Sequence, residues 1–195
     1  MNYYKIFSKI KQEMAKKLCQ DCQNFIKEGS KILDLGCGSA IIANEFQNYF
    51  KVKIVGLDIK DYRIFPIPFR IYDGKNIPFE DNSFDIVLIS YVLHHCQNPE
   101  IILKEAKRIG QKIIIFEDLP EGILAKARNK IHELIYNFCF AKNSPPLNFK
   151  TKKEWEEIFE KLELKLIAEK RISTIFDFYD PAKRVLFVLK NYEKT

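Results

Sequence analysis

The chain has 195 residues, the size of one α/β domain with a full hydrophobic core. Hydrophobic residues make up 47% and charged residues 30% of the sequence, as in soluble globular proteins, and no apolar stretch is long enough to span a bilayer. The net charge of +6 comes from scattered lysines and indicates a solvated surface. No known nucleic-acid recognition motif accompanies it, although electrostatic contact with nucleic acid stays an open alternative.

The five cysteines are an odd number without a disulfide framework, which predicts reduced thiols. Cys19 and Cys22 have the spacing of a metal or redox pair, but no second pair of ligands stands at a suitable distance, so we predict no metal site. The charged N-terminus lacks the apolar region of a signal peptide. We therefore expect a cytoplasmic protein.

Residues 1–29 are predicted to form an N-terminal helical extension that ends at Gly29 and Ser30, before the core at 30–195. Packing of this helix on the domain is the main interpretation. A lid over a ligand cleft, or contact with acidic lipid through its lysines, are the alternatives. The apolar residues near helical spacing are Tyr3, Ile6, Phe7, Ile10, Met14, Leu18, Phe25 and Ile26.

The segment KILDLGCGSA, residues 31–40, predicts a buried strand, a glycine turn and a helix start. Gly36 and Gly38 permit positive φ and close approach of a ligand, and Ser39 is expected to cap the helix that follows. A strand, glycine turn and helix N-terminus is how α/β folds hold nucleotide-like ligands. A dinucleotide site would need a third glycine where Ile41 stands, so a nicotinamide site is disfavoured.

An acid, Asp34, stands two residues before the first glycine, and this arrangement resembles the first motif of class I S-adenosylmethionine-dependent methyltransferases. The resemblance implies a single domain with a Rossmann-like seven-stranded sheet, helices on both faces and an antiparallel last strand. It also implies S-adenosylmethionine as cofactor and S-adenosylhomocysteine as product. In this family the glycines lie against the amino-acid part and ribose of the cofactor, and the acid organises its ammonium group.

A second strand is predicted to end at Asp58, 22 residues after Gly36, where its carboxylate can accept hydrogen bonds from ribose hydroxyls. Residues 60–70 contain Pro66 and Pro68, which predict a loop where the family usually has a helix. A short third strand over 69–72 follows and ends before Asp73 and Gly74.

The stretch from Asp73 to His95 is similar to the corresponding segment of small-molecule methyltransferases. The resemblance implies that Asp73 accepts a hydrogen bond from the adenine amino group and that the fourth strand, 84–90, ends beside the sulfonium. The cofactor-binding residues that we expect are Asp34, Leu35, Gly36, Cys37, Gly38, Asp58, Ile59, Asp73, Gly74, Ser90 and Tyr91.

Further elements are predicted in the order helix, strand, two helices and two strands. The helix begins at Asn98 and Pro99, and the fifth strand lies in 110–120. Two helices are expected over 122–140 and 152–161, and the last two strands near 165–170 and 184–189.

Three residues after the fourth strand are candidates for catalysis: His94 and His95, either of which could take a proton from an acceptor, and Tyr91, which could orient it. A packing role for each is the alternative. Glu117 and Asp118, at the end of the fifth strand, are expected to contact the substrate, and His132 is a further candidate, with helix-capping and core roles as alternatives.

These features predict an S-adenosylmethionine-dependent methyltransferase that acts on a small, apolar or aromatic molecule by in-line displacement. The alternatives are a non-catalytic S-adenosylmethionine-binding protein of the same fold and a methyltransferase that acts on protein or RNA. An Asn/Asp-Pro-Pro-aromatic motif, which base N-methylation would require, is absent from the end of the fourth strand. The oligomeric state is left open.

Overall fold

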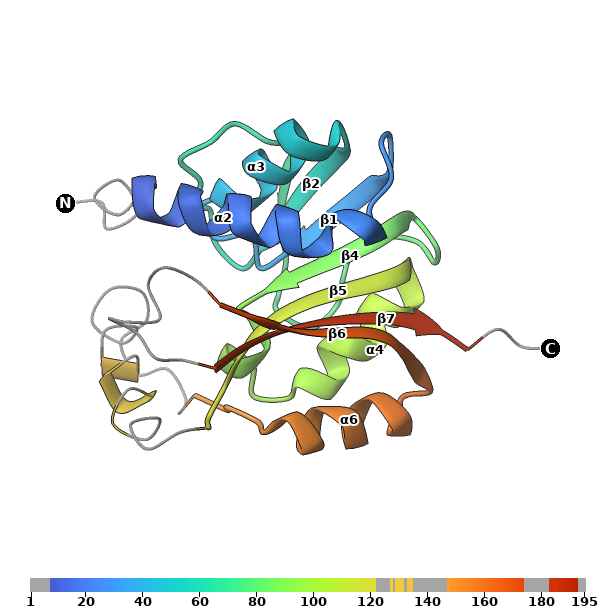
Figure 1. Cartoon of the computed structure of the whole chain (residues 1–195). Helices are drawn as coiled ribbons and strands as arrows, with labels where there is room; N and C mark the ends of the chain where they lie inside the picture. Colours follow the sequence, from blue (N-terminus) through green and yellow to red (C-terminus); the bar gives the residue numbers. More distant parts are fainter. Residues whose placement is uncertain are drawn as a thin grey trace.

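Seven strands form one sheet in the computed structural model of the chain, which describes residues 8–121, 127, 129–131, 133–134, 147–173 and 183–192 (Figure 1). Their order is β3-β2-β1-β4-β5-β7-β6, and β7 is antiparallel to both of its neighbours. The predicted sheet with an antiparallel last strand is confirmed. The strands are β1 (Lys31–Leu35), β2 (Lys53–Asp58), β3 (Phe69–Ile71), β4 (Phe84–Ser90), β5 (Gly110–Leu119), β6 (Leu164–Ile172) and β7 (Lys183–Asn191).

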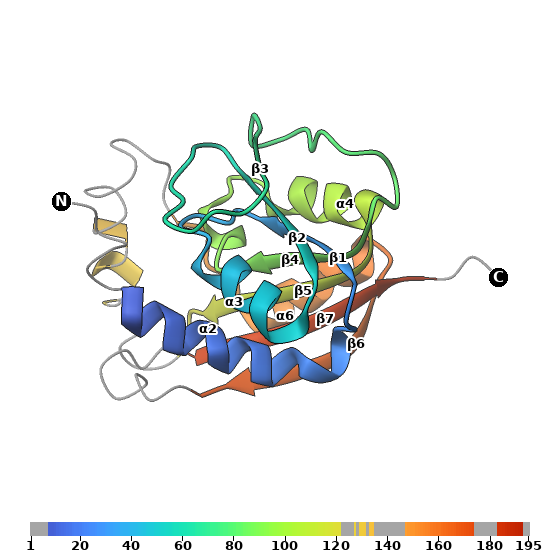
Figure 2. The ribbon, with the colours of Figure 1, turned by 90° about the horizontal axis from the view of Figure 1, so that it is seen from above.

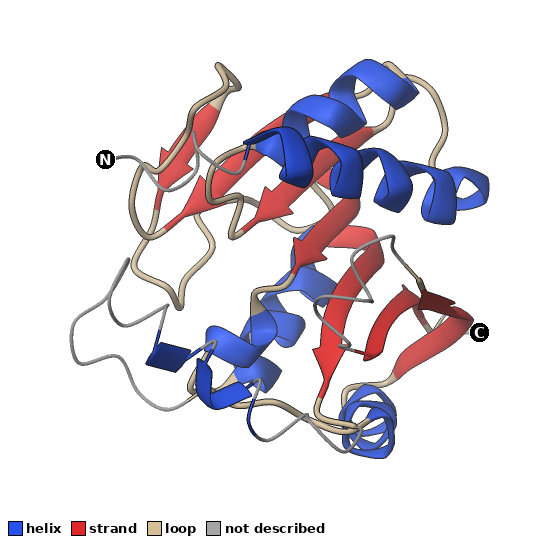
Figure 3. Cartoon of the chain, turned by 60° about the vertical axis from the view of Figure 1, so that its left-hand side comes forward, coloured by secondary structure: helices blue, strands red, loops and turns tan. Residues whose placement is uncertain are grey.

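Helices cover both faces of this sheet, because alternate residues of the buried strands are apolar on each side. Helices α2 (Ser8–Cys22) and α3 (Ile41–Phe50) pack on one face, and α4 (Pro99–Ile109) and α6 (Lys152–Lys161) pack on the other (Figure 3). Two short 3₁₀ helices, η1 (Gln23–Phe25) and η2 (Leu93–His95), follow α2 and β4. The result is a three-layer α/β arrangement with one core on each side of the sheet.

Helix α2 is the described part of the predicted N-terminal extension. It packs on the domain through Ala15, Leu18, Cys19 and Cys22, all of them buried. Ile10 was expected on the apolar face but is 44% exposed, and Tyr3, Ile6 and Phe7 lie outside the described residues. Helix α2 thus contributes to the core through its second half.

Local sequence signals explain where the other helices begin. Asn98 accepts a hydrogen bond from the backbone N–H of Glu100 and precedes Pro99, and Thr151 forms a reciprocal capping box with Glu154 at the start of α6. The prediction that Ser39 caps α3 is wrong. Ala40 is the N-cap residue, in a left-handed conformation with φ 60°, and no side chain caps that helix.

The connection between β2 and β3 is an irregular loop, as the two prolines predict. Arg63 holds it together: its guanidinium pairs with Asp61, donates a 2.6 Å hydrogen bond to the carbonyl of Ile67 and lies over the ring of Phe69. The predicted helix over 122–140, with His132, and the loop at 143–146 fall largely or wholly outside the described residues.

The carboxyl ends of the parallel strands gather at one edge of the sheet, and Figure 2 shows the arrowheads of β4 and β5 pointing the same way. This carboxyl edge is where open α/β sheets bind ligands. No helix in the described part of the chain is long and apolar enough to cross a bilayer.

Candidate functional site

The glycine turn after β1 is held tightly against its neighbours. The backbone N–H groups of Gly36 and Cys37 both donate to the carbonyl of Leu57 in β2, at 2.7 and 3.2 Å. Gly36 has φ 77°, and a Cβ atom there would lie 2.4 Å from Cγ2 of Val92. Only glycine meets both requirements, so the turn packs directly against the segment that follows β4.

Asp34, the acid before this turn, is 2% exposed at the end of β1. Its Oδ2 atom is buried and has no hydrogen-bond partner among the described residues. Burial, followed by the negative charge of Asp58, raises the pKa of Asp34 to about 7. Burial of a carboxylate oxygen without a hydrogen-bond donor lowers the stability of the ligand-free protein. A cationic ligand that donates to this oxygen would offset the loss.

Asp58 connects the end of β2 to the glycine turn. Its Oδ2 accepts a 2.8 Å hydrogen bond from the N–H of Gly38, and its Oδ1 accepts one of 2.7 Å from the N–H of Ile59. Burial raises the pKa of Asp58, while these hydrogen bonds act in the opposite direction. A Cβ atom added to Gly74 would lie 3.3 Å from Cγ2 of Ile59, so the turns after β2 and β3 lie close together, and the Ile59 side chain is 56% exposed there.

Asp73 organises its own turn. Its Oδ1 accepts hydrogen bonds from the N–H groups of Lys75 and Asn76, and its Oδ2 accepts one from the Asn76 side chain, at 2.7–2.8 Å. The hydrogen bonds from Asn76 and Lys75 lower the pKa of this carboxyl to about 2. Asp73 is therefore ionised at neutral pH and fixed in orientation, and it is exposed to solvent.

The end of β4 presents two polar side chains, Ser90 and Tyr91. The Ser90 Oγ and Tyr91 hydroxyl are buried and lack hydrogen-bond partners in the part of the chain that is described. Tyr91 has φ 58°, an uncommon conformation for a residue with a side chain, and its N–H donates to the carbonyl of Phe116. Burial is the main cause that raises the pKa of the Tyr91 hydroxyl, so this group is a neutral donor at any physiological pH.

His94 and Glu117 form a buried pair. The His94 ring is 1% exposed and its Nδ1 lies 2.6 Å from Oε2 of Glu117, which is 0% exposed. The ring of Phe149 stacks on His94 with centroids 4.7 Å apart, and the ring of His95 lies at 4.2 Å. His95 is the partly exposed member of the two histidines. Glu117 was expected to contact the substrate, but in the structure its side chain is fully buried and hydrogen-bonded to His94.

Asp118 follows Glu117 in β5 and forms an ion pair with Arg184, the residue opposite it on the adjacent strand β7. The Asp118 Oδ1 and Arg184 Nε atoms are 3.5 Å apart. Both side chains are buried, at 6% and 4% exposure. This buried pair borders the carboxyl edge, and its partner Arg184 comes from an element far away in the sequence.

The sheet divides the predicted site residues between its two faces. Asp34, Asp58, Ser90 and Asp118 alternate with core residues on the side of α2 and α3, whereas Glu117 and His94 lie on the side of α4 and α6. The structure therefore brings together the expected cofactor residues, and it places the His94–Glu117 pair apart from them. Leu35 and Cys37 are buried in the turn itself, and His132 lies outside the described residues.

Four residues that the sequence interpretation missed support this site: Arg63, Val92, Phe149 and Arg184. Each acts through a contact with a partner on another element or across a loop. The spacing of Asp61 and Arg63 was a usable local signal. The others have no local signature.

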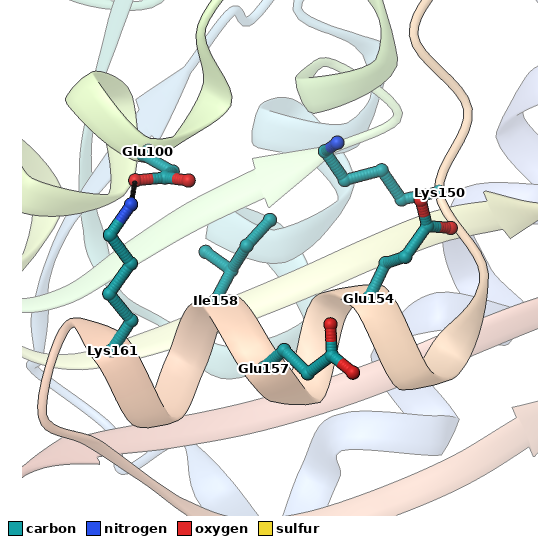
Figure 4. A pocket seen from close by; sticks show the side chains of 6 residues that line it. All are labelled: Glu100, Lys150, Glu154, Glu157, Ile158 and Lys161. Carbon is teal, nitrogen blue, oxygen red and sulfur yellow. Dashed lines mark hydrogen bonds and ion pairs between the residues drawn. The ribbon is translucent and has the colours of Figure 1, made fainter.

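A groove of about 300 Å³ lies elsewhere, between α4 and α6 (Figure 4). Its lining is mostly charged, and Lys161 reaches across to Glu100 with a 2.6 Å ion pair. The expected site residues do not line it. We interpret it as a solvated surface groove between two helices.

Comparison with known proteins identifies the family. Residues 33–113, which include the glycine turn, Asp58, Asp73 and both histidines, match the family described as "Methyltransferase domain". The MJ1123 protein of Methanocaldococcus jannaschii is 32% identical over 156 residues, which cover 78% of this chain and 72% of that protein. The chain belongs to the S-adenosylmethionine-dependent methyltransferase family. The predicted cofactor is the cofactor of this family.

Other relatives in the methyltransferase family carry names that state an acceptor. A demethylmenaquinone methyltransferase of Streptomyces griseus is 32% identical over 47% of this chain, and a sterol 24-C-methyltransferase of Aspergillus fumigatus is 33% identical over 43%. These alignments cover 44% and 26% of the two relatives. The chain thus spans less than half the length of either enzyme.

Solved structures share the fold. The PH0226 protein of Pyrococcus horikoshii has a TM-score of 0.71 at 20% identity and covers 98% of this chain and 99% of its own. An S-adenosylmethionine-dependent methyltransferase of Methanosarcina mazei has a TM-score of 0.67 at 18% identity and covers 88% and 96%. At these identities the likeness shows the fold alone.

Proposed function

We propose that this protein transfers a methyl group from S-adenosylmethionine to a small molecule. The observation that carries the proposal is Asp34, a buried carboxylate whose Oδ2 has no donor among the described residues and which precedes a turn that only glycine can form. The cofactor has an ammonium group that fits this oxygen. Sequence relatives named for quinone and sterol acceptors support a small-molecule substrate.

The residues at the carboxyl edge fit the remaining parts of the cofactor. Asp58 has acceptor capacity beyond its two backbone hydrogen bonds and would bind ribose hydroxyls, since a carboxylate has about four lone-pair sites. Ile59 would pack against the adenine ring, and Asp73 or its turn would contact the ring edge. Ser90 and Tyr91 would stand next to the acceptor.

When bound, S-adenosylmethionine supplies a sulfonium-activated methyl carbon that an acceptor lone pair attacks while the C–S electron pair returns to sulfur. The protein binds and aligns the two reactants and excludes water. An acceptor that is a hydroxyl or a carbon acid must also lose a proton. We assign that proton to a ring nitrogen of His95, because His95 is partly exposed and His94 is enclosed by Glu117, Phe149 and His95.

Calorimetric titration with S-adenosylmethionine and S-adenosylhomocysteine tests cofactor binding. We expect wild-type protein to bind both, and Asp34→Ala to lose most of the affinity. Incubation with methyl-labelled cofactor and a panel of acceptors, namely a reduced demethylnaphthoquinone, a sterol and a malonyl thioester, then tests transfer by mass spectrometry. Absence of cofactor binding would refute the proposal. Binding without transfer to any small molecule would favour a non-catalytic protein or a macromolecular acceptor.

A further inference from the structure

The carboxylate of Glu117 has three hydrogen-bond partners and no exposure to solvent. Its Oε1 accepts a 2.8 Å hydrogen bond from the N–H of Leu93, and its Oε2 accepts one of 3.2 Å from the N–H of Asp118. The same Oε2 lies 2.6 Å from Nδ1 of His94. Glu117 therefore links the end of β5 to η2, the short helix that carries both histidines.

These contacts indicate which atom carries the proton. Two backbone N–H groups point at the carboxylate, one at each oxygen, so both oxygens act as acceptors in this contact and the partner nitrogen has to donate. We therefore assign the proton to Nδ1 of His94. The short distance is typical of a hydrogen bond that involves a charged group.

The ring of His94 contacts two other rings in addition to the Glu117 carboxylate. Phe149 stacks on it at an interplanar angle of 11°, and the ring of His95 contacts it at 42°. The carbonyl of His94 also accepts a 2.7 Å hydrogen bond from the N–H of Asn148. A ring held in this way is a rigid surface against which the next side chain, His95, can rest.

We propose that Glu117 is a positioning residue for methyl transfer: it locks His94, and the locked His94 ring holds His95 in place to receive the proton of the acceptor. This inference rests on the proposed function and refines the role of its histidines. In the proton transfer, the O–H or C–H bond of the acceptor breaks, its electron pair goes to the methyl carbon, and the proton forms an N–H bond on His95. The proton then leaves to solvent.

Glu117 has no direct part in this reaction, because it is on the α4 and α6 side of the sheet and is fully enclosed. Glu117 affects the reaction only by holding the His94 ring, which in turn holds the His95 ring. Preorganised supports of this kind matter because small displacements of a reacting group lower rates strongly.

Glu117→Gln tests the proposal with little change in shape. With its oxygen still accepting the N–H of Leu93, the glutamine places its NH₂ group toward Nδ1 of His94 and the N–H of Asp118, and this favours the other tautomer of His94. Glu100→Gln is the matched control, since it removes the same charge from the surface pair with Lys161. His94→Asn is the second variant, because the asparagine amide can still donate to Glu117 while the ring that supports His95 is lost.

Nitrogen-15 NMR of the histidine rings in the full chain identifies the tautomer of His94, and the measurement needs no methyl-acceptor substrate. We expect Nδ1 protonation of His94 in wild type and in Glu100→Gln, and a changed tautomer with a shifted His95 ring signal in Glu117→Gln. Calorimetry should give cofactor affinities within about twofold of wild type for all variants. An unchanged His94 tautomer and an unmoved His95 signal in Glu117→Gln would overturn the proposal.

The labelled-cofactor assay with the reduced demethylnaphthoquinone, sterol and malonyl thioester panel adds the kinetic readout. We expect kcat to fall about tenfold or more in Glu117→Gln and in His94→Asn with acceptor KM nearly unchanged, and the double variant to be no slower than the slower single variant. Additive losses would contradict an action of Glu117 through His94. If wild type binds cofactor but methylates none of the panel, the proposed acceptor class fails, and the NMR result still decides the role of Glu117.

Discussion

The carboxylate of Asp58 accepts a 2.8 Å hydrogen bond from the N–H of Gly38, so the end of β2 holds the glycine turn of β1 in place. One side chain thus performs two tasks. It fixes the backbone of the turn, and it keeps lone pairs available at the edge where a ribose would bind.

We expect Asp58→Ala to weaken S-adenosylmethionine binding by about tenfold or more, because hydrogen bonds to charged groups contribute about 1.5–3 kcal/mol. Calorimetry measures the effect. Asp85→Ala is the matched control, since Asp85 also accepts a backbone hydrogen bond, from the N–H of Lys31, but at the opposite end of β1. Equal losses of affinity in both variants would indicate a general loosening of the sheet.

Cofactor affinity should depend on the ionisation of Asp34, whose pKa is raised to about 7. At pH 6 about a tenth of the empty protein has Asp34 ionised, so affinity should fall about tenfold from pH 8 to pH 6. Asp34→Asn should bind weakly and lose this part of the pH dependence. A wild-type affinity that does not change over this range would show that Asp34 does not contact the ammonium group.

Asp34 should also lower the stability of the cofactor-free protein at neutral pH. Its folded-state pKa lies above the ordinary value of 3.8, so the free energy of unfolding decreases as pH rises from about 4 to about 7 and stays low above that. Asp34→Asn should therefore be more stable than wild type at pH 8, by about 1 kcal/mol or more. Urea denaturation at pH 4 and pH 8 measures this, and the gain should vanish at pH 4.

Gly36→Ala should be severely destabilising. The added Cβ would lie 2.4 Å from Val92, and the residue would have to keep φ 77°. Gly29→Ala is a matched control, because Gly29 has φ 79° but nothing lies within 4 Å of its added Cβ. The control should cost about 1 kcal/mol from the backbone conformation alone, and Gly36→Ala clearly more, in thermal unfolding. Similar costs would mean that Val92 can move aside.

Tyr91→Phe should raise the stability of the empty protein, because it removes a buried hydroxyl that has no partner among the described residues. The expected gain is about 1 kcal/mol, the usual scale for an unsatisfied buried group. Tyr49→Phe should change little, because the Tyr49 hydroxyl makes only a long, exposed contact of 3.4 Å with Gln23. If Tyr91→Phe instead lowers the melting temperature, the hydroxyl has a partner in the folded protein.

Much of the fold could be predicted because its signals are local. Strand β4 and helix α6 have the predicted bounds, since their apolar patterns are clear and polar residues or a capping box mark their ends. The cap of α3 was missed because the close contact of the turn with its neighbours imposes a left-handed Ala40 in place of a serine cap. The partner of Glu117 could not be predicted, because its position behind His94 depends on which face of β5 it occupies and on the path of the chain after β4.

The division of polar groups between the two faces of the sheet has a consequence for the evolution of such proteins. Under the proposed function, substitutions around Glu117, His94 and Phe149 would alter how the acceptor loses its proton, while the side chains of Asp34 and Asp58, which lie on the α2 and α3 side, stay unchanged. Under the proposed function, variants with altered activation of the acceptor should be sought on the α4 and α6 side, and variants with altered acceptor binding around Ser90 and Tyr91 at the end of β4.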